Sequence, residues 1–502
     1  MHKYKLGYLA VLSVLLLPAC SSDDAVDTTA ALDSGLSAKI TDLGLTGDPT
    51  TGRTLPAITD TKSQLGMKLF FSKGLGGDQD SACVTCHHPT LGGGDNLSLS
   101  IGVEAVTPDL LGPGRRHIQT GHAFDGGPTV PRNAPTTFNV ALWDSVLFHD
   151  GRVESVVKEA GGNGAITGGA LNIRTPDSAF GVVDATAGDN LTTAQARFPV
   201  TSPEEMRGHT YAAGDNTTLR DALVARLDGS SIAGVDVMPL NGWQAEFDAI
   251  YGTGSPSITF GNIAEAIGEY ERSQVFVNNS WKAYVEGDTA AISEGAKEGA
   301  LLFFNSVADG GANCAECHSG DFFTDEDFYA TAMPQIGRGK GDGVDGTDDL
   351  GRFRETGDVN DEYAFRTPSL LNVEMYGPWG HAGGHTTLEA TVKYHANPTA
   401  GIQSYDFNQL EGSVQATNMV ANTQLALDKL TANRADVNFP EVTLEDVDLT
   451  DEQVGKIVMF LKALTDPCTK DASCLAQWVP NAGDSNPDGL RVLAVDNNGN
   501  EL

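Results

Sequence analysis

The feature that most constrains this chain is a pentapeptide pattern, Cys-x-x-Cys-His, that occurs twice, at residues 83–87 and 314–318. Two thiols at this spacing can form thioethers with the vinyl groups of one porphyrin, and the adjacent imidazole can then bind its iron. A zinc knuckle or a redox-active dithiol is the alternative, but a second copy in a chain with only seven cysteines favours haem. The sequence therefore predicts two covalent haem c groups. The predicted attachment residues are Cys83, Cys86, Cys314 and Cys317, with His87 and His318 as iron ligands.

Landmarks around the two motifs recur in the same order, which indicates an internal duplication. Each motif follows an apolar segment that begins with Gly and precedes an Arg- and Pro-containing loop, an Asn-Val pair and a histidine close to a glycine. Strand signals are sparse. We therefore expect a mainly α fold with two tandem cytochrome c-like domains, each carrying one covalent haem. The matching segments are 66–71 with 299–304, 132–140 with 366–373, and 149–151 with 381–383.

Composition shifts along the 502 residues suggest the domain boundaries. Folded sequence is expected to begin near Asp60, because residues 21–45 are rich in Asp, Thr, Ala and Ser, which is typical of a flexible tether. Two Gly-rich insertions, at about 161–200 and at 336–350, are expected to be loops, the second a solvated turn. The predicted units are a signal peptide at 1–20, a tether at 21–45, an N-terminal haem domain at 46–276, a C-terminal haem domain at 277–479 and a tail at 480–502.

The first twenty residues have the organisation of an export signal, with two lysines before an apolar stretch too short to span a membrane. The segment ends in Leu-Pro-Ala-Cys, the pattern of a bacterial lipobox. We expect Cys20 to carry the lipid that anchors a periplasmic protein to the outer membrane. Ordinary signal cleavage beside an incidental cysteine is the alternative.

Two cysteines remain after haem attachment and lipidation, Cys468 and Cys474. An exported location permits a disulfide between them. Such a bond would close a small loop after the last predicted helix, so we assign it a structural role.

The formal net charge of −35 restricts the partners of the chain. Nucleic acid is excluded, because its phosphates would be repelled. A basic redox partner could be steered by this charge. An acidic surface that keeps an exported protein soluble explains the charge equally well.

Longer segments carry a resemblance to a known family. They are R-N-A-P-T-T-F-N-V from Arg132, H-D-G-R from His149, S-P-E-E-M from Ser202, G-R-F-R-E-T-G-D from Gly351 and F-R-T-P-S-L-L-N-V from Phe365. With the two haem motifs, they make roughly residues 60–465 similar to the bacterial dihaem cytochrome c peroxidases and their relative MauG, the maturase of methylamine dehydrogenase. The resemblance implies that the N-terminal haem reacts with peroxide and the C-terminal haem handles electron transfer.

The resemblance also assigns residues beyond the two motifs. Glu205 matches the acid–base glutamate above the peroxide-binding iron, although composition alone would make it a helix-start carboxylate. Glu159 falls where the family often has a distal Gln. Asn133, with the backbone carbonyls of Tyr376 and Pro378, matches a calcium site between the haems, and such hard oxygen ligands suit calcium.

Two departures from the family concern the first haem and the path between the haems. His149 stands where the family has an inter-haem Trp, which puts the usual electron route in doubt. The distal histidine of many resting peroxidases would fall near Val103, which cannot bind iron. His117 and His122, in the following loop, are the alternatives for a distal iron ligand, but we expect both to be surface histidines. The first haem is therefore expected to be open to peroxide.

The third departure concerns the sixth ligand of the second haem, which is Met in classical peroxidases and Tyr in MauG. The aligned residue here is His395, which we expect to be the sixth ligand. Tyr394 is the alternative ligand, and a purely structural role for His395 is the remaining possibility. Loss of Met should lower the potential of this haem, because thioether ligation favours ferrous iron.

The resemblance implies an oxidoreductase, for which three functions stay open. The first is a periplasmic peroxidase that reduces hydrogen peroxide to water with electrons from a cytochrome c or a cupredoxin. The second is a MauG-like maturase that uses a peroxide-derived high-valent dihaem state to oxidise a side chain of a partner protein. The third is a dihaem electron carrier without peroxide chemistry. A homodimer, common among classical relatives, stays open as well.

Overall fold

The computed structural model describes residues 28–122, 124–211, 214–231, 238–254, 256–410, 414 and 417–502. The predicted signal peptide and Cys20 lie outside these residues. The helices are α1 (Thr28–Leu43), α2 (Thr61–Phe70), α3 (Leu191–Gln195), α4 (Asn216–Leu227), α5 (Trp243–Tyr251), α6 (Phe260–Arg272), α7 (Ser280–Val285), α8 (Glu294–Phe304), α9 (Phe353–Thr356), α10 (Leu388–Ala396), α11 (Pro398–Ser404), α12 (Met419–Ala435), α13 (Asp451–Ala463) and α14 (Ala472–Leu475). The antiparallel strands are β1 (Val146–Leu147), β2 (Val153–Ser155) and β3 (Ile173–Arg174) in one sheet, and β4 (Phe328–Ala330) and β5 (Ala364–Arg366) in another.

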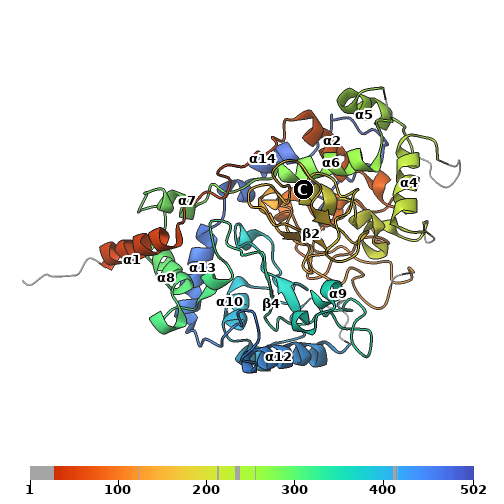
Figure 1. The fold of residues 1–502 in the computed structure, drawn as a ribbon. Coiled ribbons are helices and arrows are strands. Elements are labelled where there is room, and N and C mark those ends of the chain that lie inside the picture. The colour runs from red at the N-terminus through yellow and green to blue at the C-terminus, as the bar shows by residue number, and fades with distance from the viewer. Residues whose placement is uncertain are drawn as a thin grey trace, which may run out of the picture.

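The elements form two helical lobes (Figure 1). The upper lobe in this view gathers α2, α4, α5 and α6, and the lower lobe gathers α8, α10, α12 and α13. With so few strands, the structure confirms the predicted mainly α fold. No helix in the described ranges is both long and apolar enough to cross a membrane.

A glycine lets two helices cross closely in each lobe. A Cβ on Gly66 of α2 would lie 1.8 Å from the carbonyl oxygen of Ala266 in α6, and a Cβ on Gly299 of α8 would lie 1.9 Å from that of Lys456 in α13. No side chain fits at such a distance, so each crossing requires glycine. Both glycines belong to the apolar segments that precede the haem motifs, and each crossing supports the turn that carries its motif.

Matching asparagines hold the segment between the lobes. Asn139 and Asn372 both have a left-handed backbone, with φ of 61°. Their side-chain amides donate to the same acceptor, the carbonyl oxygen of Phe276, at 3.0 and 2.9 Å. The two Asn-Val landmarks of the sequence therefore meet at one backbone group in the centre of the molecule.

Most of the predicted tether, from Thr28 to Leu43, is a helix, so this prediction is wrong from Thr28 onward. Leu36 of α1 is fully buried, and Lys297 of α8 forms an ion pair with Asp33 at 2.6 Å. Helix α1 therefore packs on the C-terminal lobe, beside α8 (Figure 1). Folded structure therefore begins well before Asp60. The sequence did not predict this helix, because one buried apolar side chain gives no periodic pattern that would distinguish a helix from a linker.

The C-terminal tail also departs from the prediction of a separate segment after residue 479. It returns to the N-terminal lobe, where the backbone N–H of Val492 donates to the carbonyl of Phe71 at 2.9 Å. The carboxylate of Asp488 is fully buried and accepts from the indole N–H of Trp243 at 3.0 Å. The predicted disulfide between Cys468 and Cys474 is present at the start of this return.

The Gly-rich insertion at about 161–200 is more ordered than expected. It contains β3 and α3, and Leu191, Ala194 and Phe198 are buried in an apolar cluster with Trp143. The prediction of a loop was wrong here because the apolar residues are few and widely spaced, and the packing partner comes from a distant segment.

Replacing Asp488 with Ala is expected to lower the free energy of unfolding by about 1–3 kcal/mol for each buried donor left without an acceptor. The donors are the indole of Trp243, the hydroxyl of Ser72 and the backbone N–H of Leu490. Denaturant titration followed by far-UV circular dichroism measures the loss. Asp484→Ala, at an exposed position of the same tail, is the matched control and should change stability by no more than about 0.5 kcal/mol. Equal effects of both variants would contradict the role given to the tail.

Candidate active site

Both Cys-x-x-Cys-His motifs line one continuous cavity between the lobes. None of the four motif cysteines forms a disulfide in the structure, and each thiol contributes to the cavity wall. Burial raises the pKa of the Cys86, Cys314 and Cys317 thiols to about 12 and that of Cys83 still further, so all four are protonated thiols at neutral pH. Free thiols and an imidazole in an apolar cavity are the groups that covalent haem requires, and each motif fits one haem.

The imidazoles of His318 and His395 face each other across this cavity. Their ring centroids are 6.3 Å apart, with the ring planes at 60°. An ion bound midway between two imidazoles places their centroids roughly 6 Å apart, since a metal–nitrogen bond is about 2 Å long and each ring adds about 1 Å. Burial lowers the pKa of both histidines to about 4, so both rings are neutral, as ligation requires. The pair can hold the iron of the second haem.

Tyr394, the alternative to His395, points elsewhere. Its side chain is buried, and its hydroxyl donates to the carbonyl oxygen of Ala332 at 2.8 Å. Because α10 turns by about 100° per residue, adjacent residues face different directions. His395 therefore lines the cavity and Tyr394 packs behind it.

The other nitrogen of each proximal histidine is fixed by backbone carbonyls. Nδ1 of His87 lies 3.1 Å from the carbonyl oxygen of Gly93, and Nδ1 of His318 lies 3.1 Å from that of Pro368. These contacts put the proton on Nδ1 and leave Nε2 as the basic atom that faces the cavity. The two sites therefore present the same ligand in the same tautomer.

Glu205 lies on the cavity wall in a single π-helical turn, Pro203–Arg207. The hydroxyl of Ser202 caps this turn by accepting from the backbone N–H of Glu205 at 3.4 Å. Burial raises the pKa of the Glu205 carboxyl, and the nearby positive charges of Arg152 and Lys340 oppose that rise. A raised pKa makes this carboxylate a stronger proton acceptor than an exposed glutamate, which suits an acid–base group.

Sequence reasoning missed Lys340 as a member of this site. The loop at 336–350 was expected to be a solvated turn, but it brings Lys340 to the cavity wall, where burial lowers the pKa of its amine to about 8. A second omission is Glu271 of α6, whose pKa burial raises to about 8. No periodicity marks either residue, because a loop position carries no repeat and a buried Glu in a helix resembles a surface one in the sequence.

Two predictions about the distal residues, those for Glu159 and His117, need correction. Glu159 is not in the cavity, because its carboxylate accepts from the backbone N–H of Thr167 at 3.0 Å, outside the described cavity wall. His117 was expected at the surface but is buried, with 5% of its area exposed. His122 is exposed, as expected. Neither histidine lines the cavity. Val103 is buried, and its backbone N–H donates to the carbonyl oxygen of Glu204 at 3.2 Å.

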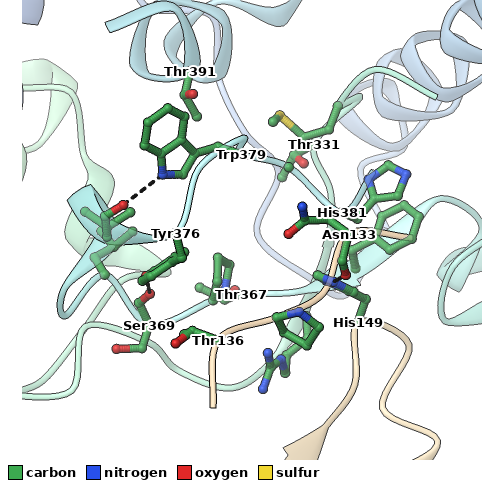
Figure 2. Close-up of a pocket in the computed structure, with 18 of the residues that line it drawn as sticks. Asn133, Thr136, His149, Thr331, Thr367, Ser369, Tyr376, Trp379, His381 and Thr391 are labelled. Carbon is green, nitrogen blue, oxygen red and sulfur yellow. Dashed lines mark hydrogen bonds between the residues drawn. The ribbon is translucent and has the colours of Figure 1, made fainter. Parts of the chain in front are cut away.

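The residues of the predicted calcium site all contribute to the cavity wall between the two motifs. Figure 2 shows Tyr376 on one side of this space and Asn133, His149 and His381 on the other. The amide nitrogen of Asn133 donates to the carbonyl oxygen of Leu97 at 2.8 Å, which leaves its amide oxygen as a ligand. Pro378 belongs to the same wall. The calcium site stays a prediction.

His149, which stands where the family has a Trp, is half-buried in the same region (Figure 2). Its Nε2 lies 3.1 Å from the carbonyl oxygen of Asn133, and burial with neighbouring arginines lowers its pKa to about 3. Aromatic surface is supplied nearby by Phe365, whose ring stacks on His381 with centroids 3.7 Å apart.

One buried guanidinium ties the loops of the site together. Arg132 donates to Asp150 at 2.5 Å and to both oxygens of Asp349 at 2.6 and 2.7 Å. All three side chains are nearly inaccessible to solvent. Burial by itself would raise the pKa of both carboxyls. The charge of Arg132 outweighs this effect and lowers both pKa values well below the usual range.

Comparison with known proteins agrees with this site. Residues 60–290 match the sequence profile of the family described as di-haem cytochrome c peroxidase. The methylamine utilization protein MauG of Methylorubrum extorquens is 27% identical over 341 residues, covering 67% of this chain and 69% of that protein. The cytochrome c551 peroxidase of Pseudomonas aeruginosa is 25% identical over 387 residues, covering 77% and 83%.

Two solved structures share the fold. The dihaem peroxidase BthA from Burkholderia thailandensis has a TM-score of 0.51 at 20% identity, over 88% of this chain and 92% of that one. A MauG-like protein associated with microbial copper homeostasis has a TM-score of 0.53 at 21% identity, over 87% and 97%.

The fold and the cavity define a class of oxidoreductases with two c-type haems. Residues 60–290 belong to the family of di-haem cytochrome c peroxidases, and the relatives named MauG and cytochrome c551 peroxidase extend the similarity over two thirds of the chain or more. Membership implies two haem c cofactors, and the relatives named cytochrome c peroxidase support an oxidoreductase that acts on peroxide.

Replacing Arg132 with Met is expected to lower the free energy of unfolding by about 3–5 kcal/mol at pH 7, because it leaves the buried carboxylate of Asp349 without a counter-charge and that of Asp150 with Arg152 alone. The pKa of each carboxyl is lowered in the folded state, so the ion pairs contribute fully above the unfolded Asp pKa of about 3.9 and lose their contribution as the pH falls below it.

The difference between variant and parent should therefore shrink on acidification, measured by denaturant unfolding at several pH values. Lys393→Met removes an exposed pair with Asp451 and is the control, with an expected change of about 0–1 kcal/mol. A loss for Arg132→Met as small as that of the control would contradict the role of the buried guanidinium.

Proposed function

We propose that this chain is an exported dihaem peroxidase that reduces hydrogen peroxide to water with electrons from a small redox protein. The observation that carries the proposal is the position of Glu205, a half-buried carboxyl of raised pKa in the same cavity as Cys83, Cys86 and His87. An electron carrier needs no acid–base group beside its haem, whereas peroxide cleavage does. The haems supply the redox chemistry and the binding site for peroxide.

In this proposal the two lobes are cytochrome c-like units related by duplication and divided in role. Cys83, Cys86 and His87 hold the peroxide-reactive haem. Its distal side is open because Val103 is packed into the protein at the place of the family's distal histidine. The electron-transfer haem is held by Cys314, Cys317, His318 and His395. The matching proximal contacts of His87 and His318, and the shared acceptor at Phe276, support the duplication.

Glu205 moves one proton during peroxide cleavage. Its carboxylate accepts the proton from the peroxide oxygen nearer the haem and returns it to the farther oxygen, which leaves as water. The charges of Arg152 and Lys340 lower the energy of the carboxylate in the first step. Lys340 comes from the other half of the chain, so the distal side is complete only when the lobes are assembled.

A MauG-like maturase is the second candidate, and a specific observation favours it. His395 faces His318 where classical peroxidases have Met, and two imidazoles lower the potential relative to imidazole and thioether. A low potential weakens the drive to take electrons from a soluble donor. The oxidising equivalents derived from peroxide would then oxidise a side chain of a partner protein.

The location and the accessory ion belong to the same proposal. Export to the periplasm and a lipid on Cys20 follow from the N-terminal sequence. A calcium ion between the haems would use the amide oxygen of Asn133 and the carbonyl oxygens of Tyr376 and Pro378, which line the region between the two motifs.

Replacing Glu205 with Gln is expected to slow the reaction with peroxide by about 10²–10⁴-fold while both haems stay attached, because the amide cannot accept the proton. Stopped-flow haem spectra after mixing with one equivalent of peroxide measure the rate. Glu204→Gln is the matched control, since this neighbour lies outside the described cavity wall and should react at the parental rate. Parental kinetics in Glu205→Gln would remove this residue from the mechanism.

The same mixing experiment separates the candidate functions. Rapid multiple turnover with reduced cytochrome c or cupredoxin supports the peroxidase. Reaction of the as-isolated protein with peroxide, but no turnover with either donor, supports the maturase. Unchanged spectra, with or without prior reduction, would leave only the electron carrier.

Replacing His395 with Ala is expected to convert the second haem from six-coordinate low-spin to high-spin and to leave the spectrum of the first haem unchanged. Resonance Raman and electron paramagnetic resonance spectra of the ferric protein report each haem. Tyr394→Phe is the control and should change neither spectrum, because that hydroxyl bonds to Ala332. A change of spin state in Tyr394→Phe alone would assign the ligand to the tyrosine instead.

A further inference from the structure

Three side chains that could bind a metal ion gather outside the haem cavity. Glu104, His122 and His209 each offer a ligand atom, and these atoms lie within 4.8 Å of one another. Nδ1 of His122 is 3.1 Å from one carboxylate oxygen of Glu104, and Nε2 of His209 is 3.8 Å from the other. The two imidazole rings stack with centroids 4.3 Å apart. Two imidazoles and a carboxylate therefore converge from separate loops.

A third imidazole lies behind this group. His117 is buried, and its Nε2 is 3.5 Å from the Glu104 carboxylate. Neither ring nitrogen of His117 has a hydrogen-bond partner among the described residues, and the same holds for Nε2 of His209. Unpaired buried nitrogen atoms are costly, and an ion would satisfy them. Three of the eleven histidines in the chain therefore surround one carboxylate.

The loops that carry these residues are fixed by two aspartates just before the first haem motif. Asp80 accepts from the backbone N–H of Glu104 at 2.6 Å, and Asp78 accepts from that of His209 at 2.8 Å. The backbone N–H of Ile118 donates to the carbonyl oxygen of Glu104 at 3.0 Å. Hydrogen bonds from their own backbone groups therefore fix the segments that carry Glu104 and His209.

We propose that Glu104, His122 and His209 form a binding site for one divalent late transition ion, Zn²⁺ or Cu²⁺, with His117 as a fourth ligand. Imidazole suits these two ions, and their affinity for nitrogen and oxygen ligands is high among first-row divalent metals. Calcium and magnesium are disfavoured, because they need several oxygen ligands and only one carboxylate is present. The proposal does not depend on the proposed function of the haem site.

The site borders the segment that carries Glu205. A Cβ on Gly102 would lie 2.3 Å from the carbonyl oxygen of Glu205, so the segment leading to Glu104 packs directly against that turn. His209 follows Glu205 by four residues. A bound ion would join the loop of Glu104 and His122 to the turn that ends in His209, and would thereby brace one wall of the peroxide side.

Calorimetric titration of the untagged holoprotein with Zn²⁺, after chelator treatment, tests the proposal. The expected result is one equivalent of Zn²⁺ bound per chain. Millimolar Ca²⁺ should leave this binding unchanged, whereas it would displace Zn²⁺ held only by the acidic surface. With Cu²⁺, electron paramagnetic resonance should show nitrogen hyperfine structure. The double variant His122→Asn, His209→Asn is expected to bind at least tenfold more weakly and to lose that structure.

Glu452→Gln removes an exposed carboxylate far from the site and is the matched control, with unchanged binding expected. Circular dichroism and haem spectra establish that the double variant is folded and loaded. His117→Phe tests the fourth ligand in the same way, with weaker binding expected. Parental affinity in the folded double variant, or no binding that survives Ca²⁺, would overturn the proposal and leave the cluster as hydrogen-bonded imidazoles alone.

Discussion

The contact on which the site depends is the buried ion group of Arg132 with Asp150 and Asp349. Arg132 begins the loop whose Pro135 carbonyl contacts the ring of His87, and Asp150 precedes the loop of Arg152. Asp349 ends the loop that carries Lys340. Three loops from both halves of the chain are therefore fixed by one guanidinium with five donors in a rigid plane. A lysine could not hold two carboxylates in this geometry.

Ion pairs also join the two halves of the chain across the boundary between the lobes. Arg352 of the C-terminal half donates to Glu154 of the N-terminal half at 2.8 Å, and Arg174 reaches Glu355 in the opposite direction at 3.0 Å. Directional charged contacts at such a boundary define its geometry more precisely than apolar contacts do. That precision matters because the cavity, with both motifs and the inter-haem residues, is formed at the boundary itself.

The two motifs are nearly identical, and residues far from them in the chain make the two sites different. The second has His395 opposite its proximal histidine, and the first has Glu205 with two cations nearby. In the proposed function, the carboxylate at the first site would serve acid–base chemistry and the imidazole at the second would serve electron transfer. The chain elements outside the haem units, α1 and the tail, each pack on one lobe and stabilise it.

Glu205 and His395, which line the cavity, were predicted from the resemblance to the dihaem family rather than from the residues alone. The sequence by itself determined the two Cys-x-x-Cys-His motifs, the mainly helical class and the disulfide, because spacing and local motifs encode these features directly. It could not place α1, the tail, the ordered part of the 161–200 insertion or Lys340. Those depend on packing partners elsewhere in the chain and leave no periodicity. Nor could it separate His395 from Tyr394, since adjacent helix residues differ only in direction, and only packing decides direction. The tertiary structure made that choice, gathered His117, His122 and His209 around Glu104, and removed Glu159 from the site.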